Sequence, residues 1–163
     1  NAMLQEFTDN FTQGMINKAT SDGRTVDDIV IMASIVELET KLPEDRKDAA
    51  SVFYNRIAQD MPLQSDITVD YALGTKNAVL TTEQVQNTDS PYNTYLYTGL
   101  PLGPICSPGL ASIDAALKPN DTDYLYFVAD MTTGKLHFNA TYEGHEQDVA
   151  TYMSDDAIAS VTQ

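Results

Sequence analysis

The sequence is poor in cysteine, in basic residues and in long apolar runs. A single cysteine, Cys106, among 163 residues excludes an internal disulfide and any zinc site that needs several cysteines. Nine Lys and Arg against 24 Asp and Glu give a formal net charge of -15, and so acidic a surface repels phosphate backbones. No apolar run approaches the roughly 20 residues that span a bilayer. We therefore expect no nucleic-acid partner, and membrane contact only through an anchor upstream of this sequence.

Apolar residues, in contrast, are sufficient for one core. A hydrophobic content of 42% argues against disorder, and the length fits a single domain over residues 1–163, with 1–24 as a helical lead-in. The spacing of apolar residues and caps predicts helices at 4–17, 25–40, 43–61, 108–117 and 141–153, a helical turn from 82, and strands at 124–128 and 136–139. Residues 63–73 fit either a short helix or an extended segment. The pattern indicates a helix-rich α+β domain with one β-hairpin.

The helix predicted over 25–40 carries the most informative acidic residue. On a helix, most of its apolar side chains form one broad arc, and Glu39 falls near the middle of that arc, beside Met32 and Ile35. Glu37 falls off the arc, nearer Ser34. A carboxyl group against apolar side chains has a raised pKa, which a general acid needs near neutral pH. The alternative is that Glu39 reaches solvent at the helix end or pairs with an arginine.

Several separate blocks of the sequence form a recognisable series. They are residues 33–40 (ASIVELET), 50–56, 63–66, 92–95, 99–101, 103–105, 108–109 and 124–130, followed by His137, Phe138, Thr141 and His145. In this order and spacing the chain resembles the YceG-like family of endolytic murein transglycosylases over about residues 30–150. The resemblance implies a lysozyme-like catalytic domain that acts on the glycan strands of peptidoglycan.

The resemblance also implies a site. The catalytic acid of the family is the Glu of a Glu-Thr pair, which is Glu39 here, the residue that the helical arc selects on its own. The candidate substrate contacts are Ser34, Gln64, Ser65, Asp66, Tyr92, Asn93 and Tyr95. The Ser-Asp pair is also ordinary turn chemistry, and loop tyrosines also pin loops to a core. No metal or cofactor is expected.

Three other reactive side chains favour structural roles. His137 lies in a predicted strand and His145 in a predicted helix, and their spacing matches no familiar metal motif. Cys106 lies in a Pro- and Gly-rich loop without an activating base, which argues against a nucleophile.

The function that the resemblance implies is cleavage of the β-1,4 bond between N-acetylmuramic acid (MurNAc) and N-acetylglucosamine (GlcNAc), leaving 1,6-anhydro-MurNAc ends. The partners would be peptidoglycan strands and cell-wall synthases, at the extracytoplasmic face of a bacterial membrane. Two alternatives stay open at this point: a non-catalytic glycan-binding module, and a muramidase that hydrolyses the same bond.

Overall fold

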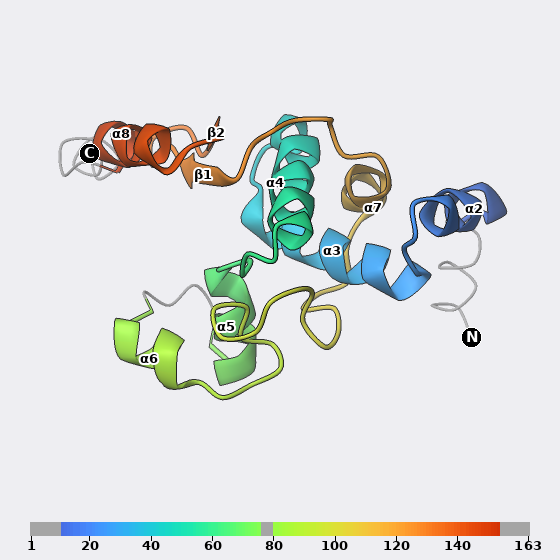
Figure 1. Cartoon of the computed structure of the whole chain (residues 1–163), viewed down its shortest axis with the longest axis horizontal. Coiled ribbons are helices and arrows are strands. Elements are labelled where there is room, and N and C mark those ends of the chain that lie inside the picture. Colours follow the sequence, from blue (N-terminus) through green and yellow to red (C-terminus); the bar gives the residue numbers. More distant parts are fainter. Residues whose placement is uncertain (1–10, 76–79, 154–163) are drawn as a thin grey trace.

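Three helices form the centre of the fold, and a hairpin with a covering helix lies beside them (Figure 1). The computed structural model describes residues 11–75 and 80–153. The helices are α2 (Gln13–Ser21), α3 (Val26–Glu39), α4 (Arg46–Ala58), α5 (Asp66–Leu73), α6 (Thr82–Asn87), α7 (Leu110–Leu117) and α8 (Tyr142–Tyr152), with a 3-10 turn, η1 (Pro43–Asp45), before α4. The strands β1 (Tyr126–Ala129) and β2 (Leu136–Asn139) form an antiparallel pair.

The central element is α3, which packs against both α4 and α7. It begins at a capping box: the Asp28 backbone N–H donates to Thr25 Oγ1 (3.1 Å), and the Thr25 N–H donates to the Asp28 carboxylate (2.8 Å). Apolar side chains between Ile29 and Val36 are buried in the core. Because α3 is fixed along its length, its last residue, Glu39, is held in a defined position.

The hairpin is attached to α4 by ring packing and by hydrogen bonds. Phe127 of β1 packs edge-on against Phe53 of α4, with ring centroids 5.8 Å apart at 89°. Asn55 Nδ2 donates to the backbone oxygens of Thr122 (2.9 Å) and Tyr124 (3.0 Å), in the chain that leads into β1. Helix α8 then covers the hairpin. One helix therefore fixes where the hairpin and α8 stand.

Most predicted elements are present, with bounds that differ in several places. The helix predicted at 43–61 is divided into η1 and α4, which ends at Ala58, and the strand predicted at 124–128 lies at 126–129. The helix predicted at 4–17 instead begins at Gln13, because Thr12 adopts an extended conformation and its Oγ1 accepts from the Met15 N–H; residues 4–10 lie outside the described part of the chain. The helix predicted from Pro108 begins two residues later, after an N-cap at Gly109. The ambiguous segment 63–73 resolves into α5, which Gly74 ends in a left-handed conformation (φ 69°).

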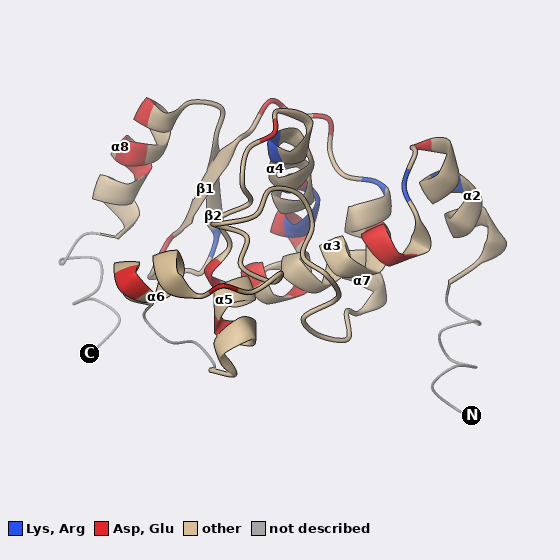
Figure 2. Ribbon diagram, turned by 60° about the horizontal axis from the view of Figure 1, so that its bottom comes forward, with Lys and Arg blue, Asp and Glu red and all other residues tan. Residues whose placement is uncertain are grey.

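Acidic residues lie on both α6 and α8, and neither of these helices carries Lys or Arg (Figure 2). Among the described residues, no helix combines the length and apolar character that crossing a membrane requires.

Candidate active site

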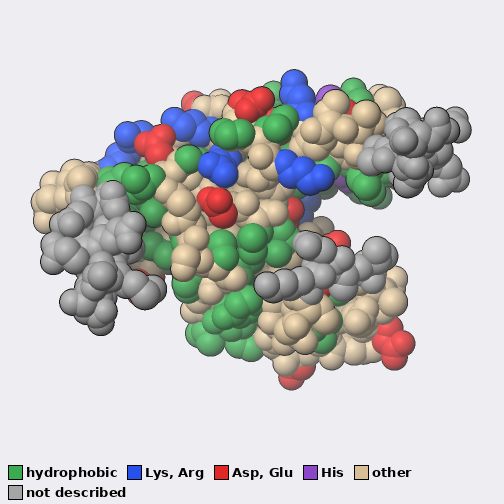
Figure 3. Space-filling model, turned by 180° about the vertical axis from the view of Figure 1, so that it is seen from behind, with side chains coloured by type: hydrophobic (Ala, Val, Ile, Leu, Met, Phe, Trp, Pro, Cys, Tyr) green, Lys and Arg blue, Asp and Glu red, His purple; other side chains and the backbone are tan. Residues whose placement is uncertain are grey.

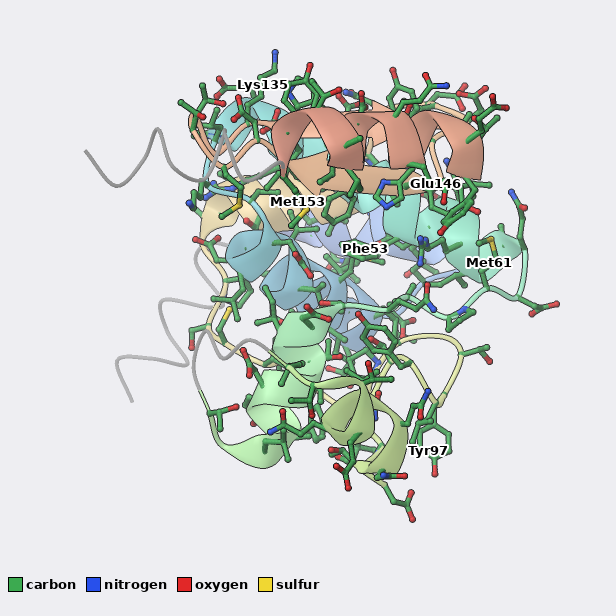
Figure 4. The ribbon with its side chains drawn as sticks, turned by 90° about the vertical axis from the view of Figure 1, so that its left-hand side faces the viewer. Phe53, Met61, Tyr97, Lys135, Glu146 and Met153 are labelled. Carbon is green, nitrogen blue, oxygen red and sulfur yellow. The ribbon has the colours of Figure 1, made fainter. Side chains whose placement is uncertain are left out.

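A cavity of about 330 Å³ opens between two parts of the fold. On one side lie the hairpin and α8, and on the other the loop before α5; Figure 3 shows the surface hollowed there. In Figure 4, Phe53 lies between α8 above and α5 and α6 below. The lining residues are Glu39, Val52, Phe53, Arg56, Leu63, Gln64, Asp66, Tyr95, Phe127 and His145. The cavity thus joins apolar side chains with a few polar groups, as small-molecule sites do.

Glu39 reaches this cavity from the end of α3 with its carboxyl group largely enclosed by protein. Burial raises its pKa to about 7, and the charge of Asp66 acts in the same direction. Ser65 Oγ donates to Glu39 Oε1 at 2.5 Å, which opposes the rise by stabilising the ionised form. The raised pKa predicted from the helical arc is confirmed. Glu39 can therefore carry a proton near neutral pH and release it to a ligand.

Glu37, two residues earlier, has the opposite environment. Its Oε2 accepts hydrogen bonds from Ser112 Oγ (2.7 Å) and the Gly109 backbone N–H (3.2 Å), and Oε1 lies 3.5 Å from Arg46 Nη2. The Ser112 hydrogen bond is the main cause that lowers the pKa of Glu37. This carboxylate stays ionised and ties the end of α3 to the start of α7.

The loop before α5 presents alternate residues to the cavity and to the protein. Gln64 adopts a left-handed backbone (φ 54°), an uncommon conformation for a residue with a side chain, and its N–H donates to the Thr94 backbone oxygen (3.1 Å). This turn directs Ser65 inward to Glu39 and leaves Gln64 and Asp66 exposed at the cavity. Asp66 also accepts a hydrogen bond from the Tyr95 hydroxyl. Four of the predicted residues, Gln64, Ser65, Asp66 and Tyr95, thus lie around Glu39.

Asn93, predicted to contact sugar, instead lies inside its loop. Its side chain is 0% exposed, and Nδ2 donates to the backbone oxygens of Val85 (2.8 Å) and Thr88 (2.9 Å). Its Oδ1 accepts from the Tyr95 N–H (3.0 Å). Because the side chain is fully buried, it is closed to a substrate, and Asn93 instead holds the loop that presents Tyr95.

Ser34 and Tyr92 also lie away from the cavity. Ser34 is buried, and its Oγ donates to the Ile31 backbone oxygen (2.7 Å) and accepts from the Ile105 N–H (3.0 Å). Tyr92 packs against the core and against the ring of Tyr71, with centroids 4.8 Å apart. Ser34, Tyr92 and Asn93, which were predicted to contact sugar, therefore do not line this cavity; Ser34 and Asn93 are buried and hydrogen-bonded within the protein, and Tyr92 packs against the core.

Two polar lining residues escaped the sequence analysis as site candidates. Arg56 lies on α4 and His145 on α8. Both positions belong to blocks that carry the family resemblance, which is the signal that could have found them. His145, which was expected to be structural, stacks on Tyr126 and also lines the cavity. His137 stacks on Tyr152, with ring centroids 3.7 Å apart, and does not line the cavity.

Among the described residues, no group of three His, Cys, Asp or Glu side chains is placed to hold a metal ion. Cys106 lies outside the cavity, and burial raises the pKa of its thiol. A thiol that stays protonated near neutral pH is a poor nucleophile.

An enclosed carboxyl group at an open cavity has the properties of a general acid catalyst. Comparison with known sequences is more specific, since the profile of the YceG-like family matches residues 1–151. The chain belongs to the YceG-like family.

Individual relatives agree with this assignment. The chain is 43% identical to an endolytic murein transglycosylase of Streptococcus pneumoniae serotype 2 (strain D39), over 82% of this chain and 25% of the relative. It is 41% identical to an endolytic murein transglycosylase of Bacillus subtilis (strain 168), over 94% of this chain and 42% of the relative. A crystal structure of a YceG-like protein from Listeria monocytogenes superposes with a TM-score of 0.76 at 47% identity, over 80% of this chain and 42% of that one. The chain thus spans less than half the length of these relatives.

Proposed function

We propose that this chain carries the catalytic site of an endolytic murein transglycosylase, which cleaves the β-1,4 bond between MurNAc and GlcNAc within a glycan strand. The observation that carries the proposal is Glu39: a carboxyl group with a pKa of about 7, at an accessible cavity, in a chain 41–43% identical to proteins of that name. Its proposed substrate, murein, lies outside the cytoplasmic membrane. The extracytoplasmic face is therefore the proposed place of action, and cell-wall synthases are proposed partners.

In the proposed reaction one carboxyl group serves twice. Protonated Glu39 gives its proton to the bridging oxygen as the bond from that oxygen to C1 of MurNAc breaks. The resulting carboxylate takes the proton of the MurNAc 6-hydroxyl, whose oxygen forms the new bond to C1. The products are a free GlcNAc 4-hydroxyl and a 1,6-anhydro ring, with no water consumed and Glu39 protonated again. Gln64 and Asp66 are proposed to contact the sugars beside the broken bond.

The cavity does not end at the Asp66 side chain. A second hollow of about 470 Å³ adjoins it toward α6, and Asp66 and Tyr95 line both. Two adjoining hollows with a shared wall can hold consecutive sugars of one strand. This supports a cut within a strand rather than recognition of a single terminal sugar.

A hydrolysing muramidase is the second candidate because Asp66 is a second carboxyl group at the same cavity. Most glycosidases use two carboxyl groups, one as an acid and the other as a nucleophile or a base for water. Asp66 already accepts a hydrogen bond from Tyr95, which suits a group that orients substrate.

Mass spectrometry of digested sacculi separates these functions. We expect the native chain to release fragments with 1,6-anhydro-MurNAc ends, each lighter by one water than the hydrolysis product. Reducing MurNAc ends would establish the muramidase instead. Sedimentation with the wall and no release would establish a glycan-binding module.

The environment of Glu39 also predicts a pH dependence. Because the acid must be protonated in the free protein, kcat/KM should fall as the pH rises through about 7. Ser65→Ala removes a hydrogen bond that favours ionised Glu39, so the pKa rises further and the fall in kcat/KM moves to higher pH. A pH profile of strand cleavage measures both. An unchanged alkaline limb in Ser65→Ala would contradict the assigned role of Ser65.

A further inference from the structure

Arg56 is a buried cation that pairs with no carboxylate among residues 11–75 and 80–153. Its Nε donates to the Leu125 backbone oxygen (2.7 Å), and Nη1 donates to the backbone oxygens of Pro62 (3.1 Å) and Leu63 (3.2 Å) and to Gln64 Oε1 (3.2 Å). Arg56 is only 8% exposed. Nη2 makes no hydrogen bond within the described part of the chain, although a guanidinium carries two donors there. These two donors remain for a group that enters the cavity.

This arrangement contrasts with other cations of the protein. Arg46 pairs with Glu37, and both Lys47 and Lys118 pair with Asp114. Taking a charge out of water without a counter-charge costs free energy, and the carbonyl oxygens around Arg56 offset only part of it. In a chain with a net charge of -15, a cation left unpaired at a cavity indicates a site for an oxygen-bearing ligand.

His145 supplies a second donor next to Arg56. Its ring stacks on Tyr126 (centroids 5.5 Å apart, 24°), and Arg56 Cζ lies 5.2 Å from the centroid of the same Tyr126 ring. Burial, followed by the charge of Arg56, lowers the pKa of His145, so that its ring is neutral near pH 7. Nδ1 is enclosed and has no hydrogen-bond partner among the residues that the structure describes. Burying an N–H that has no acceptor costs more free energy than burying an unpaired lone pair. We therefore place the ring proton on Nε2.

We propose that Arg56 Nη2 and His145 Nε2–H together bind an acyl oxygen of the sugar at the cleavage site. The inference rests on the proposed function and adds a recognition subsite to it. Both groups are donors, they share the Tyr126 ring as support, and they line the same cavity as Glu39. An acyl oxygen is an acceptor with two lone pairs and suits two donors. On this substrate it belongs either to an acetamido group or to the lactyl group of MurNAc.

Direct binding tests the subsite in the Glu39→Gln background, which leaves the probes uncut. His145→Phe keeps a ring over Tyr126 and removes the donor, and we expect Kd to rise by roughly 3- to 10-fold, the effect of one neutral hydrogen bond. Arg56→Lys removes the fork of donors, with an expected rise of roughly 10- to 100-fold. His137→Phe is the matched control, since His137 stacks on Tyr152 outside the cavity, and its Kd should not change.

Three probes identify the source of the acyl oxygen. Chitooligosaccharides carry acetamido groups alone, peptide-free MurNAc–GlcNAc strands add a lactyl carboxylate, and peptide-bearing strands add a lactyl amide. An equal loss of affinity on all three assigns the acetamido group. A loss confined to the two strand probes assigns the lactyl group.

Arg56 also holds the loop at 62–64, so its variant is compared with His145→Phe, which breaks no hydrogen bond of the described residues. The subsite would be overturned if His145→Phe bound all three probes with normal affinity and Arg56→Lys bound more weakly only together with a fall in its melting temperature. Arg56 would then have a structural role. Normal affinity of both variants would overturn the subsite equally. Failure of the Glu39→Gln parent to bind any probe would instead count against the proposed function.

Discussion

Glu39→Gln should lower strand cleavage by roughly 10²- to 10⁴-fold, because glutamine keeps the shape of the side chain but has no proton to donate. It can still accept the hydrogen bond from Ser65, so the loop before α5 should keep its place. The rate of release of anhydro-MurNAc ends from sacculi measures the effect. Turnover near that of the native chain would show that another group is the acid.

The same variant should be more stable than the native chain at alkaline pH. A carboxyl group whose pKa is raised from 4.5 to about 7 by folding contributes stability that is present below about pH 4.5 and lost as the pH rises through 7. Glutamine does not titrate, so the melting temperature of Glu39→Gln should exceed that of the native chain increasingly between pH 5 and 8. This separates loss of catalysis from loss of fold.

Glu37→Gln is the matched control, two residues away on the same helix. We expect most cleavage activity to remain, with about 1 kcal/mol less stability at pH 7 from the weakened contacts with Ser112 and Arg46. Since folding lowers the pKa of Glu37, that difference should shrink as the pH falls through the folded pKa. Complete loss of activity in Glu37→Gln beside an active Glu39→Gln would reverse the assignment of the acid.

Asn93→Ala should lower the melting temperature by roughly 5–15 °C. The change leaves the backbone oxygens of Val85 and Thr88 and the Tyr95 N–H without partners, at a cost of about 2–4 kcal/mol in the free energy of unfolding. Thermal denaturation measures it. Activity should fall together with the folded fraction, because Asn93 has no free group for substrate.

Asn87→Ala provides the comparison on the neighbouring helix α6. Asn87 is exposed at the end of α6, and the same truncation there should change the melting temperature by no more than about 1–2 °C. If Asn93→Ala were as mild as Asn87→Ala while abolishing cleavage, Asn93 would be a substrate contact after all.

The contrast between Glu39 and Asn93 shows what the sequence could predict of the site. The apolar arc of α3 is a local property with a fixed period, so it places Glu39 against the core without knowledge of any other element. Asn93 lies in a long loop without such a period. Its burial depends on how that loop folds back over α6, which no local pattern encodes.

The place of Arg56 and His145 at the cavity could not be predicted from local sequence patterns, for a related reason. Arg56 and His145 come from α4 and α8, which are distant in the sequence and meet only because the hairpin carries α8 back to α4. The hairpin and the caps at Thr25 and Thr141 were predictable because their signals span a few residues. The distance between the two walls depends on tertiary packing alone.

That distance is set by one turn of α4. Asn55 holds the segment that leads into β1, and the adjacent Arg56 holds both that segment and the loop at 62–64 on the opposite side. The same turn therefore holds both walls, and spreading them apart would break several of these hydrogen bonds at once. A glycan strand that enters the cavity therefore meets two walls whose spacing is already fixed. Because the walls are ordered when the protein folds, binding does not carry that entropy cost. More of the binding energy of each sugar is then available to distort the bond that is cleaved.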